Sequence, residues 1–368
     1  MKIIVKKFGG TSLSDIDRIN RAISYIVKTK SAGYKVVIVV SAMGKETDRL
    51  LSLTDNLEEY RESDDLSALL SAGEQISSSI FSIMLNKQKI KGQSFQGWQV
   101  PILTNIGPSN AYIKNIETKK IIKSLKLGMT PVISGFQGIS KDNRITTLGR
   151  GGSDTTAVAL AAKLSAVRCD IYTDVDGVYS ADPRIVKEAK KINKINYEEM
   201  LELSSLGAKV LHTRSVQLAL KYNVPLQVLS SFTGKAGTML TKQNKNLEQQ
   251  IIRGIAHSSN ESLITLIGIK NKPGISALIF NALSNEGISV DMIVQSGSAV
   301  DSTVTYAFTV TKSDANKSKH IMDSLEKKLN FTNVLINKSI CKVSIVGLGM
   351  KTNAGVADRM FSELAKNN

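Results

Sequence analysis

A lysine and two glycines lie together near the N-terminus, in the run Lys7-Phe8-Gly9-Gly10-Thr11-Ser12. The run follows an apolar stretch, Ile3 to Val5, and precedes a helical pattern that opens near Ser14. A strand that enters a glycine turn and then a helix N-terminus directs backbone N–H groups at one point, which is an arrangement that binds phosphate. Lys7 adds a mobile positive charge beside that turn. Because paired glycines also serve packing in many strand-to-helix turns, this stretch alone leaves both interpretations open.

A second glycine-rich run, LGRGGSDTT at residues 148 to 156, leads into an alanine-rich helix predicted for residues 157 to 164. Glycine lets a ligand approach the backbone, and one of the polar residues Ser153 to Thr155 can cap the helix. Arg150 can form two parallel hydrogen bonds to a carboxylate. The run therefore predicts a carboxylate site, and the alternative is an ordinary capped helix with a surface arginine.

Acidic residues follow another predicted strand, Asp170 to Tyr172, in the run TDVDGVY at 173 to 179 and in Asp182-Pro183-Arg184. Taken alone, both runs are ordinary turn chemistry. Beyond them, Asn196 with Glu199 three residues later predicts a helix capping pair.

A lysine is expected at the start of a later helix. The run LGAKV from Leu206 predicts a helix start with Lys209 in its first turn, where a cation opposes the helix dipole and indicates a nearby anion. A solvated lysine is the alternative. We expect His212 to be structural rather than catalytic, and Leu226 to Leu229 to be the last strand of this domain.

The elements that would position these residues alternate between strand and helix. Residues 15 to 30 place isoleucines at helical spacing, namely Ile16, Ile19, Ile23 and Ile26. A strand is expected at Lys35 to Ser41, because its uninterrupted β-branched run Val36 to Val40 is typical of parallel strands covered on both faces. Another strand is expected at Thr130 to Ser134. Ligands bind outside the carboxyl ends of strands in open parallel sheets, so Ser41, Gly135 and their neighbours should face one crevice.

Composition limits the class of protein. The 368 residues suggest two or three domains, and a mean hydropathy of −0.04 is typical of a globular protein. We expect a cytoplasmic protein with no membrane partner, because no run of eighteen apolar residues and no signal-peptide core occur. Cys169 and Cys341 belong to no metal motif, so no metal site from protein side chains is predicted. The net charge of +16 comes with scattered lysines and 5% aromatic residues, which argues against nucleic-acid binding.

An internal repeat follows the polar segment TKQNKNLEQQ at 241 to 250, which reads as a linker. Gly268 and Gly347 match at a separation of 79 positions, and three further pairs match at 81: Gly274 with Gly355, Phe280 with Phe361, and Leu283 with Leu364. Each copy predicts a strand, a glycine loop and an amphipathic helix, and two such units should pack together. Copy one continues into a strand at 288 to 293, whereas the sequence stops at the matching point of copy two. We therefore expect the natural chain to extend beyond Asn368.

Together these motifs resemble the aspartate kinases of the amino-acid kinase superfamily, which carry C-terminal tandem ACT domains. The markers are KFGGTS at 7 to 12, GRGGSDTTA at 149 to 157, TDVDGVY at 173 to 179, DPR at 182 to 184, GAKVLH at 207 to 212, NKPG at 271 to 274 and VDMIVQ at 290 to 295. The resemblance implies a three-layer αβα sandwich with a mainly parallel sheet at 1 to 240, and a linker at 241 to 250. It also implies two ferredoxin-like (βαββαβ) ACT domains, at 251 to 335 and at 336 to 368, the second incomplete.

The resemblance also implies three groups of site residues. Those that would line an ATP site are Lys7, Phe8, Gly9, Gly10, Thr173, Asp174, Tyr179, Asp182, Pro183, Arg184, Lys209 and Val210. Those that would hold L-aspartate are Ser41, Thr47, Glu74, Arg150, Gly151, Gly152, Ser153 and Asp154. Those that would form an allosteric effector site are Asn271, Gly274, Ile275, Ser276, Gln295, Asn353 and Val356. Thr213 replaces a frequent proline of the family, and Asn271 replaces a frequent acid.

Phosphoryl transfer to aspartate needs little base catalysis, because a carboxylate with a pKa of about 3.9 is already ionised at neutral pH. Positive groups must instead bring two anions together. By resemblance, Lys7 would stabilise the γ-phosphoryl group, Lys209 the other nucleotide phosphates, and Mg²⁺ would bridge phosphate oxygens. Arg150 would clamp a substrate carboxylate, and Glu74 would pair with the ammonium. Asp154 would orient Lys7, and these two are the predicted catalytic residues.

The implied activity is the ATP-dependent phosphorylation of L-aspartate to 4-phospho-L-aspartate. That reaction is the first step of the pathway to lysine (through diaminopimelate), threonine and methionine. Feedback by lysine, threonine or both through the ACT domains, and assembly into a homodimer or larger homo-oligomer, are further implications. The alternatives are an amino-acid kinase with another carboxylate acceptor, and a catalytically weak ACT protein that senses amino acids.

Overall fold

The computed structural model describes residues 1–55, 63–107, 109–208, 210–242, 251–297, 303–347 and 353–367. The chain divides into two compact units, which are described separately below. The first comprises Met1–Ile255 and Ile345–Asn368, and the second comprises Ala256–Ser344. The domain boundaries expected from the sequence stay predictions.

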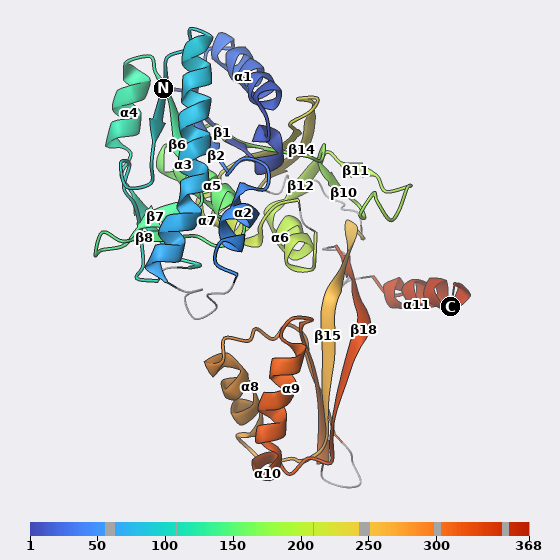
Figure 1. Ribbon diagram of the computed structural model, residues 1–368. Helices are drawn as coiled ribbons and strands as arrows, with labels where there is room; N and C mark the ends of the chain where they lie inside the picture. The colour runs from blue at the N-terminus through green and yellow to red at the C-terminus, as the bar shows by residue number, and fades with distance from the viewer. Residues whose placement is uncertain are drawn as a thin grey trace. The chain divides into compact units, whose positions relative to one another are not determined.

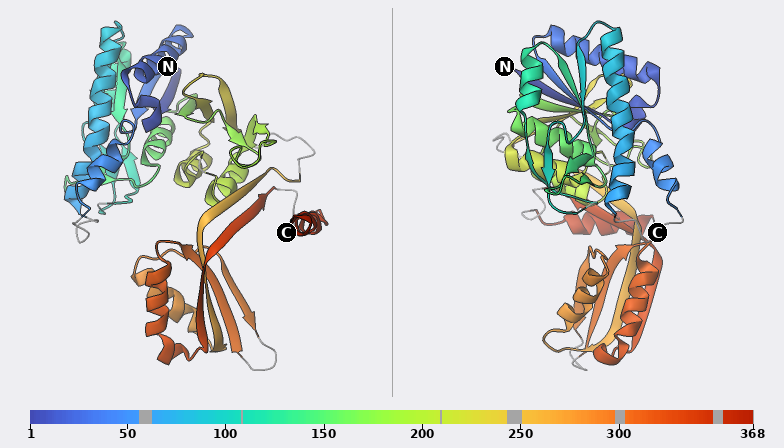
Figure 2. Two further views of the ribbon diagram at one scale, coloured as in Figure 1. Left: turned by 45° about the vertical axis from the view of Figure 1, so that its right-hand side comes forward. Right: turned by 60° about the vertical axis from the view of Figure 1, so that its left-hand side comes forward.

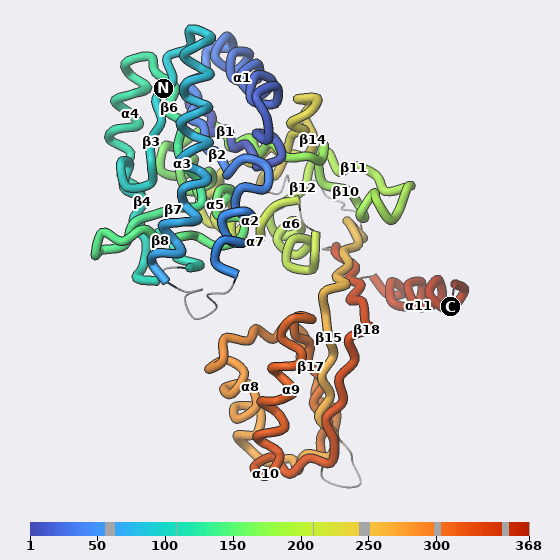
Figure 3. The backbone as a smooth tube through the Cα atoms, in the orientation of Figure 1, coloured from blue at the N-terminus to red at the C-terminus, as the bar shows by residue number. Residues whose placement is uncertain are grey.

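An eight-stranded sheet forms the centre of the first unit, in the order β12-β14-β13-β9-β1-β2-β6-β3 (Figure 1). Its strands are β1 (Ile3–Phe8), β2 (Lys35–Val40), β3 (Gly92–Phe95), β6 (Thr130–Ser134), β9 (Arg168–Thr173), β12 (Lys194–Asn196), β13 (Leu226–Ser230) and β14 (Ala236–Thr241). All neighbours in this sheet pair in parallel except β13 and β14. β1 and β2, both labelled in Figure 3, lie side by side near the centre of the sheet. β9 pairs with the other edge of β1, although more than 150 positions separate the two strands in sequence.

Helices cover both faces of this sheet, as the right panel of Figure 2 shows. One face packs against α1 (Ile16–Ser31) and α3 (Asp64–Lys87), and the other against α4 (Lys119–Lys126) and α5 (Gly152–Lys163). Outside these lie η1 (Gly10–Leu13), α2 (Glu46–Ser52), α6 (Tyr197–Ser205) and α7 (Thr213–Tyr222). The predicted three-layer αβα sandwich is therefore confirmed.

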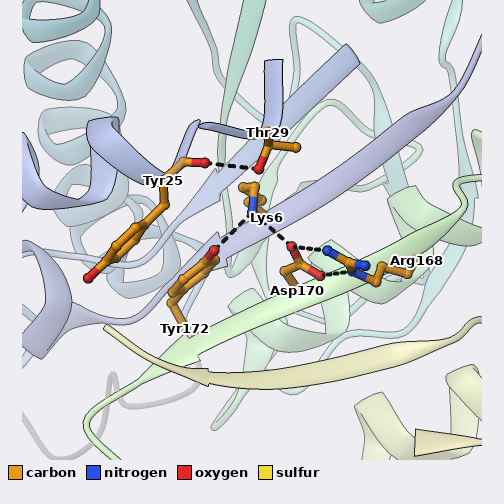
Figure 4. Close-up of polar contacts among 6 residues, drawn as sticks. All are labelled: Lys6, Tyr25, Thr29, Arg168, Asp170 and Tyr172. Carbon is orange, nitrogen blue, oxygen red and sulfur yellow. Dashed lines mark hydrogen bonds and ion pairs between the residues drawn. The ribbon is translucent and has the colours of Figure 1, made fainter. Parts of the chain in front are cut away.

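Alternation along β1 decides which side chains reach which layer. Phe8 belongs to the core under α1 and α3, where it stacks on Tyr172 and Phe81. Lys6 faces the same layer, and its ammonium donates to Asp170 (2.8 Å) and to the Tyr172 hydroxyl (2.9 Å), as Figure 4 shows. Lys7 has the opposite orientation and points toward α5. The sequence did not indicate that a lysine beside Lys7 is fully buried.

Two smaller sheets complete this unit. One has the order β5-β4-β7-β8 and consists of β4 (Ile102–Thr104), β5 (Ile113–Ile116), β7 (Gln137–Ile139) and β8 (Ile145–Thr147). The other pairs β10 (Val178–Tyr179) with β11 (Lys191–Ile192). The four-stranded sheet matters for the site because the glycine-rich run follows β8 directly.

The end of the first unit differs from the sequence expectation in two places. No helix begins at Leu206: α6 ends at Ser205, and α7 begins at Thr213 with His212 as its N-cap. The Ala208 N–H bonds to the Leu203 carbonyl and closes α6, so the prediction that a helix starts at Leu206 was wrong. Lys209 itself lies outside the described residues. The strand expected at Leu226 is not the last one, because β14 follows and pairs with it. The capping box of Asn196 and Glu199 is confirmed.

The second unit has the βαββαβ order of a ferredoxin-like domain. Its elements are β15 (Gly254–Lys270), α8 (Ile275–Asn285), β16 (Ile293–Gly297), β17 (Thr303–Thr311), α9 (Ala315–Ser324), α10 (Glu326–Leu329) and β18 (Asn333–Val346). The sheet order is β16-β17-β15-β18. Ile279 and Leu283 of α8 pack with Phe308 of β17 in its core.

The internal repeat appears as two matching helices. α8 and α11 (Val356–Lys366) both have 11 residues and start 81 positions apart. Each is preceded by a glycine in the left-handed region, Gly274 with φ 91° and Gly355 with φ 92°. The repeat predicted from the sequence is thus confirmed, including the position at which each helix starts.

One described helix, α3, is long and apolar enough to cross a membrane, judged by length and composition only. Half of the residues in its apolar window are buried inside the structure. Such a helix is weak evidence for a membrane span, and the core contacts of Phe81, Met84 and Leu85 account for its apolar character.

Candidate active site

A pocket of about 340 Å³ opens where the carboxyl ends of β1 and β2 meet the N-terminus of α5. Its walls come from well-separated segments of the chain: Lys7, Gly10, Ser41, Ala42, Gly44, Thr47, Glu74, Phe136, Gly149, Arg150, Gly151, Gly152, Ser153 and Asp154. This is the position that sheet topology predicts for a ligand.

All eight residues expected to hold L-aspartate line this pocket, together with Lys7 and Gly10 from the expected ATP site. Sequence reasoning missed four lining residues: Ala42, Gly44, Phe136 and Gly149. All four belong to loops that the sequence had indicated, and Phe136 follows Gly135, whose neighbours were expected to face the crevice. The φ of Phe136, 67°, is an unusual backbone conformation for an aromatic residue, and such positions concentrate at functional sites.

Lys7 and Asp154 form an ion pair across the pocket. Nζ of Lys7 lies 2.7 Å from Oδ1 of Asp154, and both side chains are 12% exposed. The parallel pairing of β1 with β2 and β9 fixes the backbone of Lys7, and the first turn of α5 fixes Asp154. A buried partner holds the ammonium in one place, while the remaining exposure leaves it accessible to a ligand.

Glu74 is a buried carboxyl group with one free oxygen. It comes from the middle of α3, is 3% exposed, and accepts a hydrogen bond from the Ala42 N–H at Oε1 (2.9 Å). Among the described residues, its Oε2 has no hydrogen-bond partner. Burial raises the pKa of Glu74 to about 8, although the Ala42 N–H and the charge of Lys7 act in the opposite direction. Without a ligand, this carboxyl group is therefore mostly protonated at neutral pH.

Arg150 stands between two glycines in the left-handed region, Gly149 with φ 73° and Gly151 with φ 70°. Its side chain is exposed and lines the pocket. Gly151 is the N-cap of α5, so the positive end of that helix dipole meets the same pocket. An arginine and a helix N-terminus at one wall form an environment suited to a carboxylate or a phosphate.

The residues expected to bind ATP differ in their burial and in their hydrogen-bond partners. Phe8 is fully buried, so only its backbone could meet a ligand, whereas Gly9 lies beside the ammonium of Lys7. Thr173 donates to Asp174 (3.0 Å), and Tyr179 donates to Asp176 (2.7 Å).

The remaining ATP residues follow on the turn after β10. The guanidinium of Arg184 forms two hydrogen bonds with Asp182, at 2.7 and 3.0 Å, and is 79% exposed. Pro183 lies between them and is exposed, and Val210 is partly buried in the connection from α6 to α7. The predicted role of Lys209 falls on a residue outside the described part of the chain.

Expected effector residues occur in both units. In the second unit, Ser276 forms a hydrogen bond with the Tyr306 hydroxyl (2.7 Å), and Gln295 is the cross-strand partner of Tyr306. Asn271 and Gly274 are exposed in the loop before α8, and Ile275 begins that helix. Asn353 and Val356 belong to the first unit, before and at the start of α11.

Among the described residues, no group of three or more histidine, cysteine, aspartate or glutamate side chains could hold a metal ion. This finding is compatible with Mg²⁺, which proteins usually bind through one or two carboxylates, waters and substrate phosphates.

Comparison with known proteins identifies the fold and the family. Residues 2–230 match the amino acid kinase family, and residues 264–323 match an ACT domain. An aspartokinase of Pseudomonas aeruginosa is 45% identical over 368 residues, which cover 100% of this chain and 89% of that protein. The chain belongs to the aspartate kinase family.

Other members of the aspartate kinase family agree with this assignment. An aspartate kinase of Stutzerimonas stutzeri is 43% identical over 369 residues, covering 100% of this chain and 89% of that protein. The structure of E. coli aspartokinase III in complex with aspartate and ADP superimposes with a TM-score of 0.82 at 27% identity, covering 98% of this chain and 91% of that one. As a member of this family, the protein is an ATP-using kinase.

Proposed function

We propose that this aspartate kinase transfers the γ-phosphoryl group of ATP to the side-chain carboxylate of L-aspartate, giving ADP and 4-phospho-L-aspartate. One observation carries the proposal: Lys7, paired with Asp154, shares a pocket with Arg150 and with the free oxygen of Glu74. These groups match the three charged parts of the reaction, namely a phosphoryl group, a carboxylate and an ammonium. E. coli aspartokinase III, a relative, has been crystallised with aspartate and ADP.

The acceptor needs no general base, because its side-chain carboxylate is already ionised at neutral pH. The barrier is the approach of this anion to the polyanionic nucleotide. Lys7 is positioned to reduce that repulsion, since its ammonium lies between the Gly9-Gly10 turn and the first turn of α5. Asp154 orients this ammonium as the transferring group gains charge, so catalysis rests on positioning and electrostatics.

Recognition of aspartate would use other residues of the same pocket. Arg150 and the N-terminus of α5 would bind a substrate carboxylate. Glu74 would bind the ammonium through its free Oε2, and it would lose its proton when that cation arrives. A substrate with one ammonium group and two carboxylates would thus leave each of these charged groups paired.

ATP would lie along the Gly9-Gly10 turn, with Thr173, Asp174 and Tyr179 after β9 and the segment Asp182–Arg184 beyond them. Backbone N–H groups of a glycine turn can bind phosphate oxygens, and Lys209 is expected to add charge there. Mg²⁺, when bound, would neutralise charge on the β- and γ-phosphate oxygens. It would be held by those oxygens and water rather than by a carboxylate cage.

The proposal also includes regulation by amino acids and assembly into a homo-oligomer. Lysine, threonine or both would act at the ACT units, near Ser276 and Gln295, and the ACT units would pair subunits into a homo-oligomer. The family match to an ACT domain supports regulatory ligand binding, and E. coli aspartokinase III has been crystallised with lysine and aspartate. The role in the pathway to lysine, threonine and methionine, and the location in the cytoplasm, stay predictions from the sequence.

A coupled assay of ADP release tests the proposed reaction. Purified protein is given ATP, Mg²⁺ and aspartate, glutamate or acetylglutamate, and the assay is repeated with lysine, threonine and both. We expect turnover with aspartate at least about tenfold above the other acceptors, since an acceptor of another length leaves buried polar groups unpaired. A clear preference for glutamate or acetylglutamate would refute the assignment of the acceptor, and no turnover with any acceptor would refute the enzymatic function.

A further inference from the structure

The turn that carries Arg150 has little rigidity of its own. Two glycines flank the arginine, and both occupy the left-handed region that glycine enters easily. Within the turn, the Gly152 N–H bonds to the Gly149 carbonyl (3.0 Å). A residue that must present a guanidinium at a fixed point therefore depends on support from outside the turn.

That support comes from the first turn of α7. The guanidinium of Arg214 donates one hydrogen bond to the Leu148 carbonyl and another to the Ala111 carbonyl (2.7 Å). It also lies over the ring of Tyr112, 4.8 Å from the ring centroid. The Ala111 N–H bonds to the Thr147 carbonyl (2.9 Å), so Arg214 closes a bridge between two segments that already touch. Its planar fork fits two carbonyl oxygens at once, which a lysine cannot reproduce.

A second contact from the same helix end fixes the other side of the turn. The ring of His212, the N-cap of α7, packs directly on Gly151, and a Cβ atom at Gly151 would overlap the Cβ, Cγ and Cδ2 atoms of the histidine. The His212 carbonyl accepts hydrogen bonds from Ser215, at 2.7 Å from Oγ and 2.9 Å from N. The start of α7 thus holds the turn at Leu148 and at Gly151, on both sides of Arg150.

We propose that Arg214 is a positioning residue for substrate binding, which holds the Gly149–Gly152 turn so that Arg150 meets the carboxylate of the amino-acid substrate. The inference rests on the proposed function, because it assigns Arg150 to substrate recognition. Arg214 is outside the set of residues lining the pocket and acts through the turn. Its loss should weaken substrate binding more than turnover at saturation.

Steady-state kinetics on the full chain test this inference with the variants Arg214→Met, Arg214→Lys, Arg150→Met and the double variant. We expect Arg214→Met to raise the KM for aspartate about 10- to 100-fold, since displacement of a positioning group by about 1 Å costs up to that factor. The KM for ATP and kcat should change far less. Arg214→Lys should recover only part of the loss, because it lacks the fork.

The double variant separates positioning from a general structural effect. In the Arg150→Met background, Arg214→Met should add little to the KM for aspartate, because the group that it positions is already absent. Multiplicative effects of the two substitutions, or an unchanged KM in Arg214→Met, would overturn the inference. Arg144→Met is the matched control, since Arg144 also makes two hydrogen bonds, to Asp64 and Asp65, but is exposed and outside the pocket.

Hydrogen exchange distinguishes failure of this inference from failure of the proposed function, because it requires no turnover. In Arg214→Met, amides of residues 147 to 155 should exchange at least about tenfold faster, while amides of β2 keep their rates, as expected for local opening. If no acceptor is phosphorylated but the amides of the turn exchange faster, the proposed function is refuted, whereas the inference that Arg214 holds the turn is retained. Unchanged exchange in the turn would overturn the inference whatever the activity. Tyr112→Leu, which keeps both hydrogen bonds, gives a milder variant should Arg214→Met fail to fold.

Discussion

Replacing Glu74 with glutamine should separate substrate recognition from stability. Burial raises the pKa of this carboxyl group from 4.5 to about 8, and a shift of this size corresponds to roughly 5 kcal/mol against the ionised form. Glutamine keeps an oxygen for the Ala42 N–H but cannot ionise. It therefore removes the charge that would pair with the substrate ammonium and leaves the shape of the site nearly unchanged.

The sign of the stability effect follows from proton linkage. Between pH 4.5 and about 8, the folded protein keeps a proton on Glu74 that the unfolded chain releases, so the free energy of unfolding falls as pH rises through this range. At pH 7 the cost is about 3 kcal/mol. Without ligand, Glu74→Gln should thus be more stable than the wild type above pH 5, with the difference growing until about pH 8. Urea unfolding at pH 5, 7 and 8.5 measures this difference.

Binding should show the opposite effect. Loss of a charge-assisted hydrogen bond costs about 1.5–3 kcal/mol, which is roughly a 10- to 150-fold increase in the KM for aspartate. The wild type should release close to one proton on binding aspartate at pH 7, which calorimetry in buffers of different ionisation enthalpy counts. The glutamine variant should release none. Glu198→Gln, the same change at an exposed position of α6, should alter neither stability nor KM.

The assignment of Glu74 would be refuted if aspartate bound the wild type without proton release and the glutamine variant kept a normal KM. A higher KM with no gain in stability would retain the contact but refute the argument that Glu74 is held protonated in the free protein.

Two further substitutions test the two faces of β1. Lys7→Ala should lower kcat by about 10²- to 10³-fold, with a smaller change in the KM for ATP. The control Lys2→Ala, at the exposed start of the chain, should leave kcat unchanged. A near-normal kcat in Lys7→Ala would show that Lys7 takes no part in the chemistry. Among the described residues, Lys6→Met leaves the buried Asp170 with Arg168 as its one ion-pair partner, so it should cost about 3–5 kcal/mol of unfolding free energy. Combining Lys6→Met with Asp170→Leu should largely recover this loss. Equal destabilisation of the single and double variants in urea would show that the ion pair is not the cause.

The sequence predicted those helices, strands and caps whose pattern lies within their own residues. The uninterrupted apolar run at residues 36 to 40 became the central strand β2, because both faces of such a strand are covered. The strand expected at Thr130 to Ser134 became β6. Isoleucine spacing predicted α1, with Ile19, Ile23 and Ile26 buried. The capping box and the glycine before each repeat helix were equally local, since a cap is formed by residues a few positions apart.

The features that the sequence did not reveal depend on distant partners. Burial of Lys6 requires Asp170 and Tyr172, which are more than 160 positions away, and nothing near Lys6 indicates them. β14 has little apolar alternation and exists because β12 and β13 pair with it. The helix expected at Leu206 failed because the Ala208 N–H closes α6, and because His212, which is not a favoured cap, begins α7.

The charges of the free pocket favour one order of events. Lys7 is paired with Asp154, and Glu74 is held mostly protonated by burial, so Arg150 is the charged lining residue without an ion pair among the described residues. A pocket with this balance should attract an anion, and under the proposed function the substrate carboxylate would meet this exposed guanidinium first. The ammonium of the substrate would then reach Glu74, which would ionise and restore neutrality at the buried end. A substrate lacking the ammonium would leave Glu74 neutral and its Oε2 unpaired, so we expect the pocket to favour amino acids over simple dicarboxylates.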